Sequence, residues 1–136
     1  MANRRPLAAV STAQLVAGAA GLTVALARRR NFDVGFMRGD PGTVARDAFW
    51  AGTAYSAPSY MLAAQLWAIR RLRSGGPDDG ARRLLGFLGA VMVPGYLMER
   101  HGREHLRPGG WDPVETPVVV AGVGLAAAMA VLGHRR

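Results

Sequence analysis

Four apolar stretches separated by arginine clusters are the feature that most limits how this 136-residue chain can fold. The stretches run from Leu7 to Ala27, Ala48 to Ile69, Leu84 to Met98 and Thr116 to Gly133. The hydrocarbon core of a bilayer is about 30 Å thick and needs roughly 20 apolar residues of helix to cross it. Three of the stretches approach or reach that length. We therefore predict an all-α fold, a four-helix transmembrane bundle with short loops.

The predicted spans leave little of the chain for anything else. They cover residues 7–27, 46–70, 82–101 and 114–133, so we expect residues 1–136 to form a single integral membrane domain. A soluble helical protein of this size would place polar residues at every third or fourth position of each helix. The first stretch instead carries no charge, which is typical of a helix surrounded by lipid.

The first stretch also has the outline of a secretory signal peptide, because basic residues precede it and Ala25-Leu26-Ala27 matches a small-x-small cleavage site. It is, however, longer than the usual 7–15 apolar residues of such a peptide. Three arginines follow the site directly, and basic flanks tend to stay on the cytoplasmic side. We therefore expect this segment to be retained as the first span.

The net charge of +8 is carried by 17 arginines, with no lysine, and these lie mainly at the ends of the apolar stretches. That placement favours anionic lipid head groups of the bilayer as the partner. Nucleic acid is not expected as a partner, because no basic–aromatic surface motif accompanies the charge. The chain has no cysteine, which excludes disulfides and thiol chemistry.

Arginine placement also bears on orientation in the cell membrane. With the N-terminus inside, nine arginines lie on the inner side and eight on the outer side. We expect a multi-pass protein whose N- and C-termini are cytoplasmic. So small a difference leaves insertion in both orientations, as an antiparallel pair, as the alternative.

Small residues recur every fourth position in two of the stretches, at Ala9, Ala13, Ala17, Gly21 and Ala25 in the first. Such stripes let helices approach closely inside a bilayer. We interpret them as packing faces within the bundle, with a homo-oligomer seam as the alternative.

The second stretch is the least lipid-like, because serine, tyrosine and proline gather near its middle. Pro58 removes one backbone donor and frees a carbonyl one turn earlier. A kinked helix repaired by neighbouring hydroxyls is one interpretation. The other is a polar niche at mid-depth, of the kind transporters use for binding. The ligand-binding candidates are Tyr55, Ser56, Ser59 and Tyr60, together with Tyr96 of the third stretch.

The third stretch is short, so we expect its helix to continue past Met98 and carry charged residues to the membrane surface. Glu99 and His101 would then form an acid–base pair, with Glu104 as a second partner. His101 to His105 also matches the zinc pattern H-x-x-E-H, but it places a glycine in the helix, and no third ligand is evident beyond Asp112 or Glu115. We expect ion pairing there, and no metal and no cofactor.

These observations lead to three functional hypotheses. The first is a small membrane protein that binds a lipophilic ligand or partner, or moves a small solute. The second is a membrane-embedded isomerase or cyclase of a lipid or isoprenoid, with Glu99 as the acid and His101 or Glu104 as its partner. The third is a structural subunit of a membrane complex.

Overall fold

The computed structural model describes residues 4–35, 37–53 and 55–135, and this part of the chain is all-helical, without β-strands. The all-α prediction is therefore confirmed. A 3-10 turn over Pro41–Thr43 precedes the second helix. The α-helices are α1 (Arg4–Arg28), α2 (Val44–Trp50), α3 (Ser59–Arg73), α4 (Asp79–Met98), α5 (Arg100–Leu106) and α6 (Glu115–His134).

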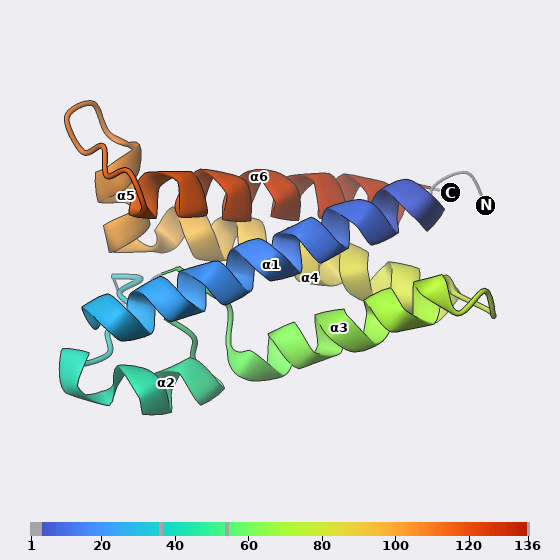
Figure 1. The fold of residues 1–136 in the computed structure, drawn as a ribbon, viewed down its shortest axis with the longest axis horizontal. Helices are drawn as coiled ribbons and strands as arrows, with labels where there is room; N and C mark the ends of the chain where they lie inside the picture. Colours follow the sequence, from blue (N-terminus) through green and yellow to red (C-terminus); the bar gives the residue numbers. More distant parts are fainter. Residues whose placement is uncertain (1–3, 36, 54, 136) are drawn as a thin grey trace.

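Four long helices run along the longest axis of the molecule, and the two short ones lie at one end (Figure 1). α1 packs against α3 and α6, and α4 packs against the same two helices. The N-terminus of α1, the C-terminus of α6 and the α3–α4 loop lie together at one end of the molecule, which we call the terminal end. The opposite end, which holds α2 and α5, is called the α5 end.

Two of these helices, α1 and α6, are long and apolar enough to cross a membrane by length and composition. Helix α3 has only 15 residues, and the first turns of α4 carry Asp79, Arg82 and Arg83. Among the described helices only these two pass the test, so the prediction of a four-helix transmembrane bundle is not confirmed beyond its all-helical character.

The single helix expected over 46–70 is two helices, because the described residues between Trp50 and Ser59 are non-helical. Gly52 has a φ of 97°, and a Cβ at this position would lie 2.7 Å from the Ser56 carbonyl oxygen. Pro58 stands directly before α3 with an extended ψ of 148°. A left-handed residue and a proline together stop the helix, so the expected kink is a full interruption. We call residues 51–58 the α2–α3 break.

The helix expected over 82–101 was predicted to continue past Met98, but it is instead longer at its N-terminal end. It begins at Asp79 and ends at Met98, and Glu99 is extended, with a φ of −71° and a ψ of 123°. The Glu99 side chain accepts a hydrogen bond from the backbone N–H of His101, so it caps α5. The extended backbone of Glu99 ends α4, and its side chain caps the start of α5, so the chain bends between these two helices.

Small residues do bring helices together, but not along the whole predicted stripe. Ala9 and Ala13 are exposed, whereas Gly21 and Ala25 are buried. A Cβ at Gly21 would collide with the Tyr55 carbonyl oxygen, so this glycine lets the α2–α3 break lie directly on α1.

Candidate functional site

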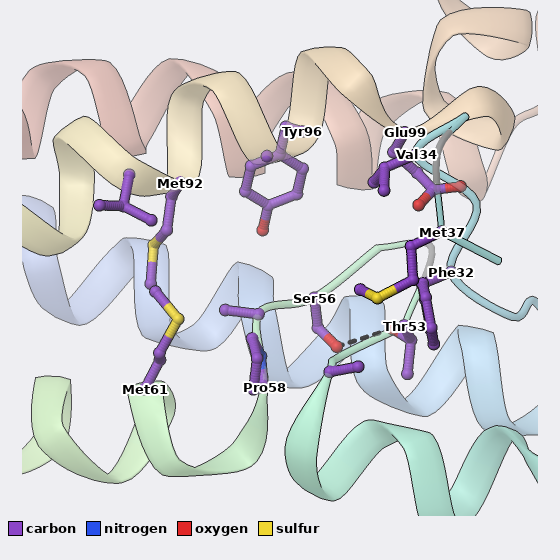
Figure 2. A pocket seen from close by; sticks show the side chains of 14 residues that line it. Phe32, Val34, Met37, Thr53, Ser56, Pro58, Met61, Met92, Tyr96 and Glu99 are labelled. Carbon is purple, nitrogen blue, oxygen red and sulfur yellow. Dashed lines mark hydrogen bonds between the residues drawn. The ribbon is translucent and has the colours of Figure 1, made fainter. Parts of the chain in front are cut away.

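A cavity of about 150 Å³ lies where the α2–α3 break turns away from α4 (Figure 2). Its walls come from the loop after α1, from the break, from Met61 of α3 and from Met92 of α4. The loop contributes Phe32, Val34 and Met37. Most of the lining is apolar, so the cavity suits an apolar molecule better than water.

Three polar features interrupt this lining. The Tyr96 hydroxyl points between the helices in Figure 2, and it lies 3.4 Å from Nε2 of Gln14. Thr53 and Ser56 share a hydrogen bond of 2.7 Å across the break. Glu99 stands at the end of α4, on the side of the cavity opposite Met61. A few polar groups in an apolar cavity are what fix the orientation of a small ligand.

Glu99 is the carboxyl group of this lining, and it is only 3% exposed. Its two carboxyl oxygens lie 3.1 and 2.9 Å from the backbone nitrogen of Asp33, which donates to them. Burial raises the pKa of Glu99 to about 7, against the lowering effect of these hydrogen bonds. The side chain therefore anchors the loop after α1 and also presents a carboxyl group that titrates near neutral pH.

The structure divides the five predicted ligand-binding residues. Ser56 and Tyr96 line the cavity. Tyr55 is fully buried and donates its hydroxyl to Glu115 instead. Ser59 Oγ donates to the carbonyl of Ala48 at 3.0 Å and so ties α3 to α2, while Tyr60 is 60% exposed. The niche is thus built from α4 and the break rather than from one polar helix.

The predicted acid–base residues are also separated. Glu104 is exposed and pairs with Arg100, whose Nε lies 3.1 Å from Oε1. His101 is half-buried outside the cavity lining, and burial lowers its pKa. Glu99 alone of the three reaches the cavity. Among the described residues, no group of three or more histidine, aspartate or glutamate side chains is placed to hold a metal ion.

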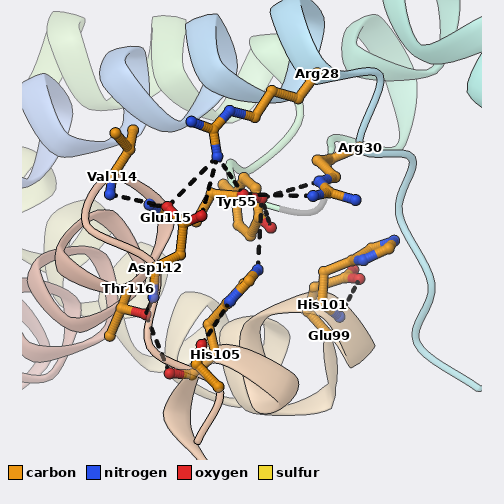
Figure 3. Close-up of polar contacts among 11 residues, drawn as sticks. Arg28, Arg30, Tyr55, Glu99, His101, His105, Asp112, Val114, Glu115 and Thr116 are labelled. Carbon is orange, nitrogen blue, oxygen red and sulfur yellow. Dashed lines mark hydrogen bonds and ion pairs between the residues drawn. The ribbon is translucent and has the colours of Figure 1, made fainter.

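A second polar cluster centres on Glu115, the first residue of α6, which is fully buried (Figure 3). Arg28 and Arg30 both form ion pairs with its carboxylate, and Tyr55 donates its hydroxyl to it. Nε2 of His105 lies 3.6 Å from Oε1. These contacts join α1, the α2–α3 break, α5 and α6 at the α5 end, beside the cavity walls.

The sequence pattern suggested that Glu115 gathers with His105, but its pairing with Arg28 and Arg30 was missed. The cavity wall formed by Phe32, Val34 and Met37 was missed as well. A signal for the first was available, because a carboxylate opening an apolar stretch needs a cationic partner at the same membrane depth. The arginines that end the first stretch provide it. The loop wall has no comparable signal, because its position depends on the break in α2–α3.

No protein-family model, curated protein or solved structure matches this chain.

Proposed function

We propose that this protein is an integral membrane protein that binds a small lipophilic molecule in the cavity between α4 and the α2–α3 break. The observation that carries the proposal is the cavity itself, which combines an apolar lining with one buried carboxyl group. Ligand sites in proteins have this composition, an apolar concavity with a small number of placed polar groups.

The outward faces of the long helices support placement in a bilayer. A soluble bundle exposes polar residues on these faces. Here, only 33% of the most apolar window of α1 and 28% of that of α6 is buried inside the protein. Large apolar side chains are exposed on each of the long helices: Val16 and Leu26 on α1, Leu66 and Trp67 on α3, Phe87 and Val91 on α4, and Val120 and Val131 on α6.

The cavity volume limits the ligand. An apolar cavity of about 150 Å³ holds a molecule the size of benzene. A whole phospholipid is far too large, so the ligand is a monocyclic compound or one short arm of a larger molecule. Glu99 gives it a preferred chemistry, because its carboxylate accepts hydrogen bonds and attracts a cation. We therefore propose a small lipophilic amine or alcohol.

The same size limits the affinity. The most efficient small ligands gain about 1.5 kcal/mol per non-hydrogen atom, and ordinary ones gain far less. With roughly six to eight such atoms in the cavity, we expect a Kd of about 0.1–1 mM for a simple probe.

Methionine methyl groups provide the test, because three of the six methionines, Met37, Met61 and Met92, line the cavity. The full chain is labelled with ¹³C at its methionine methyls, placed in detergent micelles and titrated with benzylamine and with toluene. We expect the signals of these three residues to shift with saturation. Met98 and Met129 lie outside the lining and serve as internal controls.

A matched pair of glycine substitutions separates binding in the cavity from partition into the micelle. Gly95 lines the cavity, Gly124 of α6 does not, and no heavy atom lies within 4 Å of a Cβ built at either position. Gly95→Leu is expected to weaken the titration at least several-fold, and Gly124→Leu to leave it unchanged. Equal shifts at all described methionines, or equal effects of the two variants, would contradict a specific site.

A second candidate function, acid catalysis on an isoprenoid, is favoured by one observation. Glu99 places a carboxyl group with a pKa of about 7 on the wall of an apolar cavity, where it can donate a proton. Glu99 would protonate one alkene carbon of an allylic isoprenoid alcohol, and its carboxylate would take back a proton from the carbon on the other side, so that the double bond moves. In deuterated water the alcohol would then gain carbon-bound deuterium. The incorporation should be lost in Glu99→Gln and retained in Glu104→Gln. Without incorporation above the protein-free control, this candidate fails.

A further inference from the structure

An open groove of about 490 Å³ runs along the outer face of α3, separate from the cavity. Its lining follows one helical stripe, in which each residue is three or four positions from another, so all its members share one face. The lining residues are Ala63, Leu66, Trp67, Arg70, Arg71 and Ser74.

The chemistry of the groove changes in order along the helix. Ala63 and Leu66 form its apolar part, and Arg70 and Arg71 lie nearer the terminal end. Trp67 stands between them and is 55% exposed. A tryptophan between apolar and charged residues is typical of the boundary between acyl chains and head groups in a bilayer. The stripe therefore has the polarity profile of a phospholipid, from acyl chain to phosphate.

The surrounding charge is strongly positive. Within the described part of the chain, the terminal end holds eight arginines against two aspartates, a formal charge of +6. The α5 end holds eight arginines against seven carboxylates, a formal charge of +1. A surface of this kind attracts anionic lipid, at about 1 kcal/mol for each arginine close to the membrane surface.

The arginines of the groove are available to such a partner. Among the described residues, Arg70 and Arg71 form no ion pair with a carboxylate, and no acidic residue lines the groove. Asp78, a buried carboxylate in the adjoining loop, is paired with Arg4, whose Nε lies 2.8 Å from Oδ2. Nothing in the described structure competes for the two guanidinium groups.

We propose that this groove binds one anionic phospholipid, with its phosphate at Arg70 and Arg71 and the start of an acyl chain against Leu66 and Trp67. The proposal rests on the membrane placement given above and not on the cavity. It assigns to α3 a specific lipid contact, in addition to the general attraction of the charged end.

Quenching of Trp67 fluorescence tests the proposal. The full chain with Trp50→Phe and Trp111→Phe retains one tryptophan, and it is placed in bilayers containing phosphatidylglycerol or phosphatidylcholine with brominated acyl chains. We expect quenching at lower mole fractions of brominated phosphatidylglycerol. Arg70→Gln with Arg71→Gln should reduce that preference about thirtyfold, since each arginine contributes about 1 kcal/mol.

Arg73→Gln with Arg83→Gln is the matched control, because it removes the same charge from the same end without touching the groove lining. It should leave most of the preference intact. Equal quenching by both lipids, or equal effects of the two double variants, would overturn the site. Displacement of the lipid by inorganic phosphate alone would also overturn it, since the partner would then be the free anion.

Absence of quenching by either lipid would mean that α3 does not contact acyl chains, and it would overturn the membrane placement together with this site. The methionine titration reports on the cavity alone. A negative quenching result for the groove can therefore be told apart from a negative result for ligand binding in the cavity.

Discussion

Arg30 donates a hydrogen bond from its Nε to Oε1 of Glu115 at 2.9 Å, and so joins the loop after α1 to the first turn of α6. Glu115 is fully buried, and a buried carboxylate is costly unless it is paired and hydrogen-bonded. Arg28 and Tyr55 supply further partners from two other segments. Through Tyr55, Glu115 holds the α2–α3 break, which forms one wall of the cavity.

Replacing Glu115 with glutamine tests this dependence. The amide keeps the size of the side chain but leaves Arg28 and Arg30 without their buried counterion. We expect the free energy of unfolding to fall by about 2 kcal/mol, since the arginines remain partly in solvent. Denaturant unfolding of the protein in micelles, followed by circular dichroism, measures it. Glu104→Gln breaks an exposed pair and should cost less than about 0.5 kcal/mol. Similar losses for both variants would show that the cluster holds nothing in place.

Gly21 tests the contact between α1 and the break. A Cβ at this position collides with the Tyr55 carbonyl oxygen, so Gly21→Ala must push the break away from α1. We expect a loss of about 1–3 kcal/mol, typical of overpacking, despite the better helix propensity of alanine. Gly124→Ala meets no atom within 4 Å and should be neutral or stabilising by up to about 1 kcal/mol. Thermal unfolding in micelles compares the two. A neutral Gly21→Ala would contradict the close approach.

Titration of Glu99, which lies beyond the last residue of α4, should make stability depend on pH. Its pKa is raised from 4.5 to about 7 in the folded protein, so the folded state binds the proton more tightly. The folded protein is therefore favoured below pH 4.5, and this contribution is lost as pH rises to about 7. We expect the unfolding free energy of the wild type, relative to Glu99→Gln, to fall by up to about 3 kcal/mol between pH 4.5 and 7.5. A pH-independent difference would mean that Glu99 titrates normally.

The helices could be predicted from the sequence because their cause is local. The apolar runs of α1 and α6 have the length of a helix, and turn residues such as Asp40-Pro41-Gly42 mark where a new helix begins. The C-terminal end of α4 was harder to predict, because Glu99, which follows it, accepts hydrogen bonds from the backbone of Asp33, 66 positions away in the sequence.

The candidate site could be predicted only in fragments for the same reason. Ser56, Tyr96 and Glu99 were singled out as polar groups in apolar surroundings, and all three line the cavity. They had been assigned to two different sites, because the contact between the break and α4 is not encoded in either segment alone. Tyr55 resembled a ligand-binding residue from its neighbours, yet its hydroxyl is already used by Glu115.

The orientation of the chain in the membrane should follow from the charge of its two ends. Arginines at the terminal end outnumber those at the α5 end by only nine to eight in the sequence, but in the structure Arg28, Arg30 and Arg100 at the α5 end are paired with carboxylates. The more positive terminal end should face the anionic cytoplasmic leaflet. Reporters fused to the C-terminus, each active on one side of the membrane, should then report a cytoplasmic terminus.

The difference of one arginine between the two ends is small enough to be reversed by substitution. Replacing Arg70, Arg71 and Arg73 with glutamine leaves six arginines against eight, so we expect a mixed or inverted orientation. Replacing Arg100, Arg103 and Arg107 instead leaves nine against five and should keep the wild-type orientation. If both reporters are active in the wild type, the chain inserts in both orientations. The groove on α3 would then face the cytoplasmic leaflet in some molecules and the opposite leaflet in others.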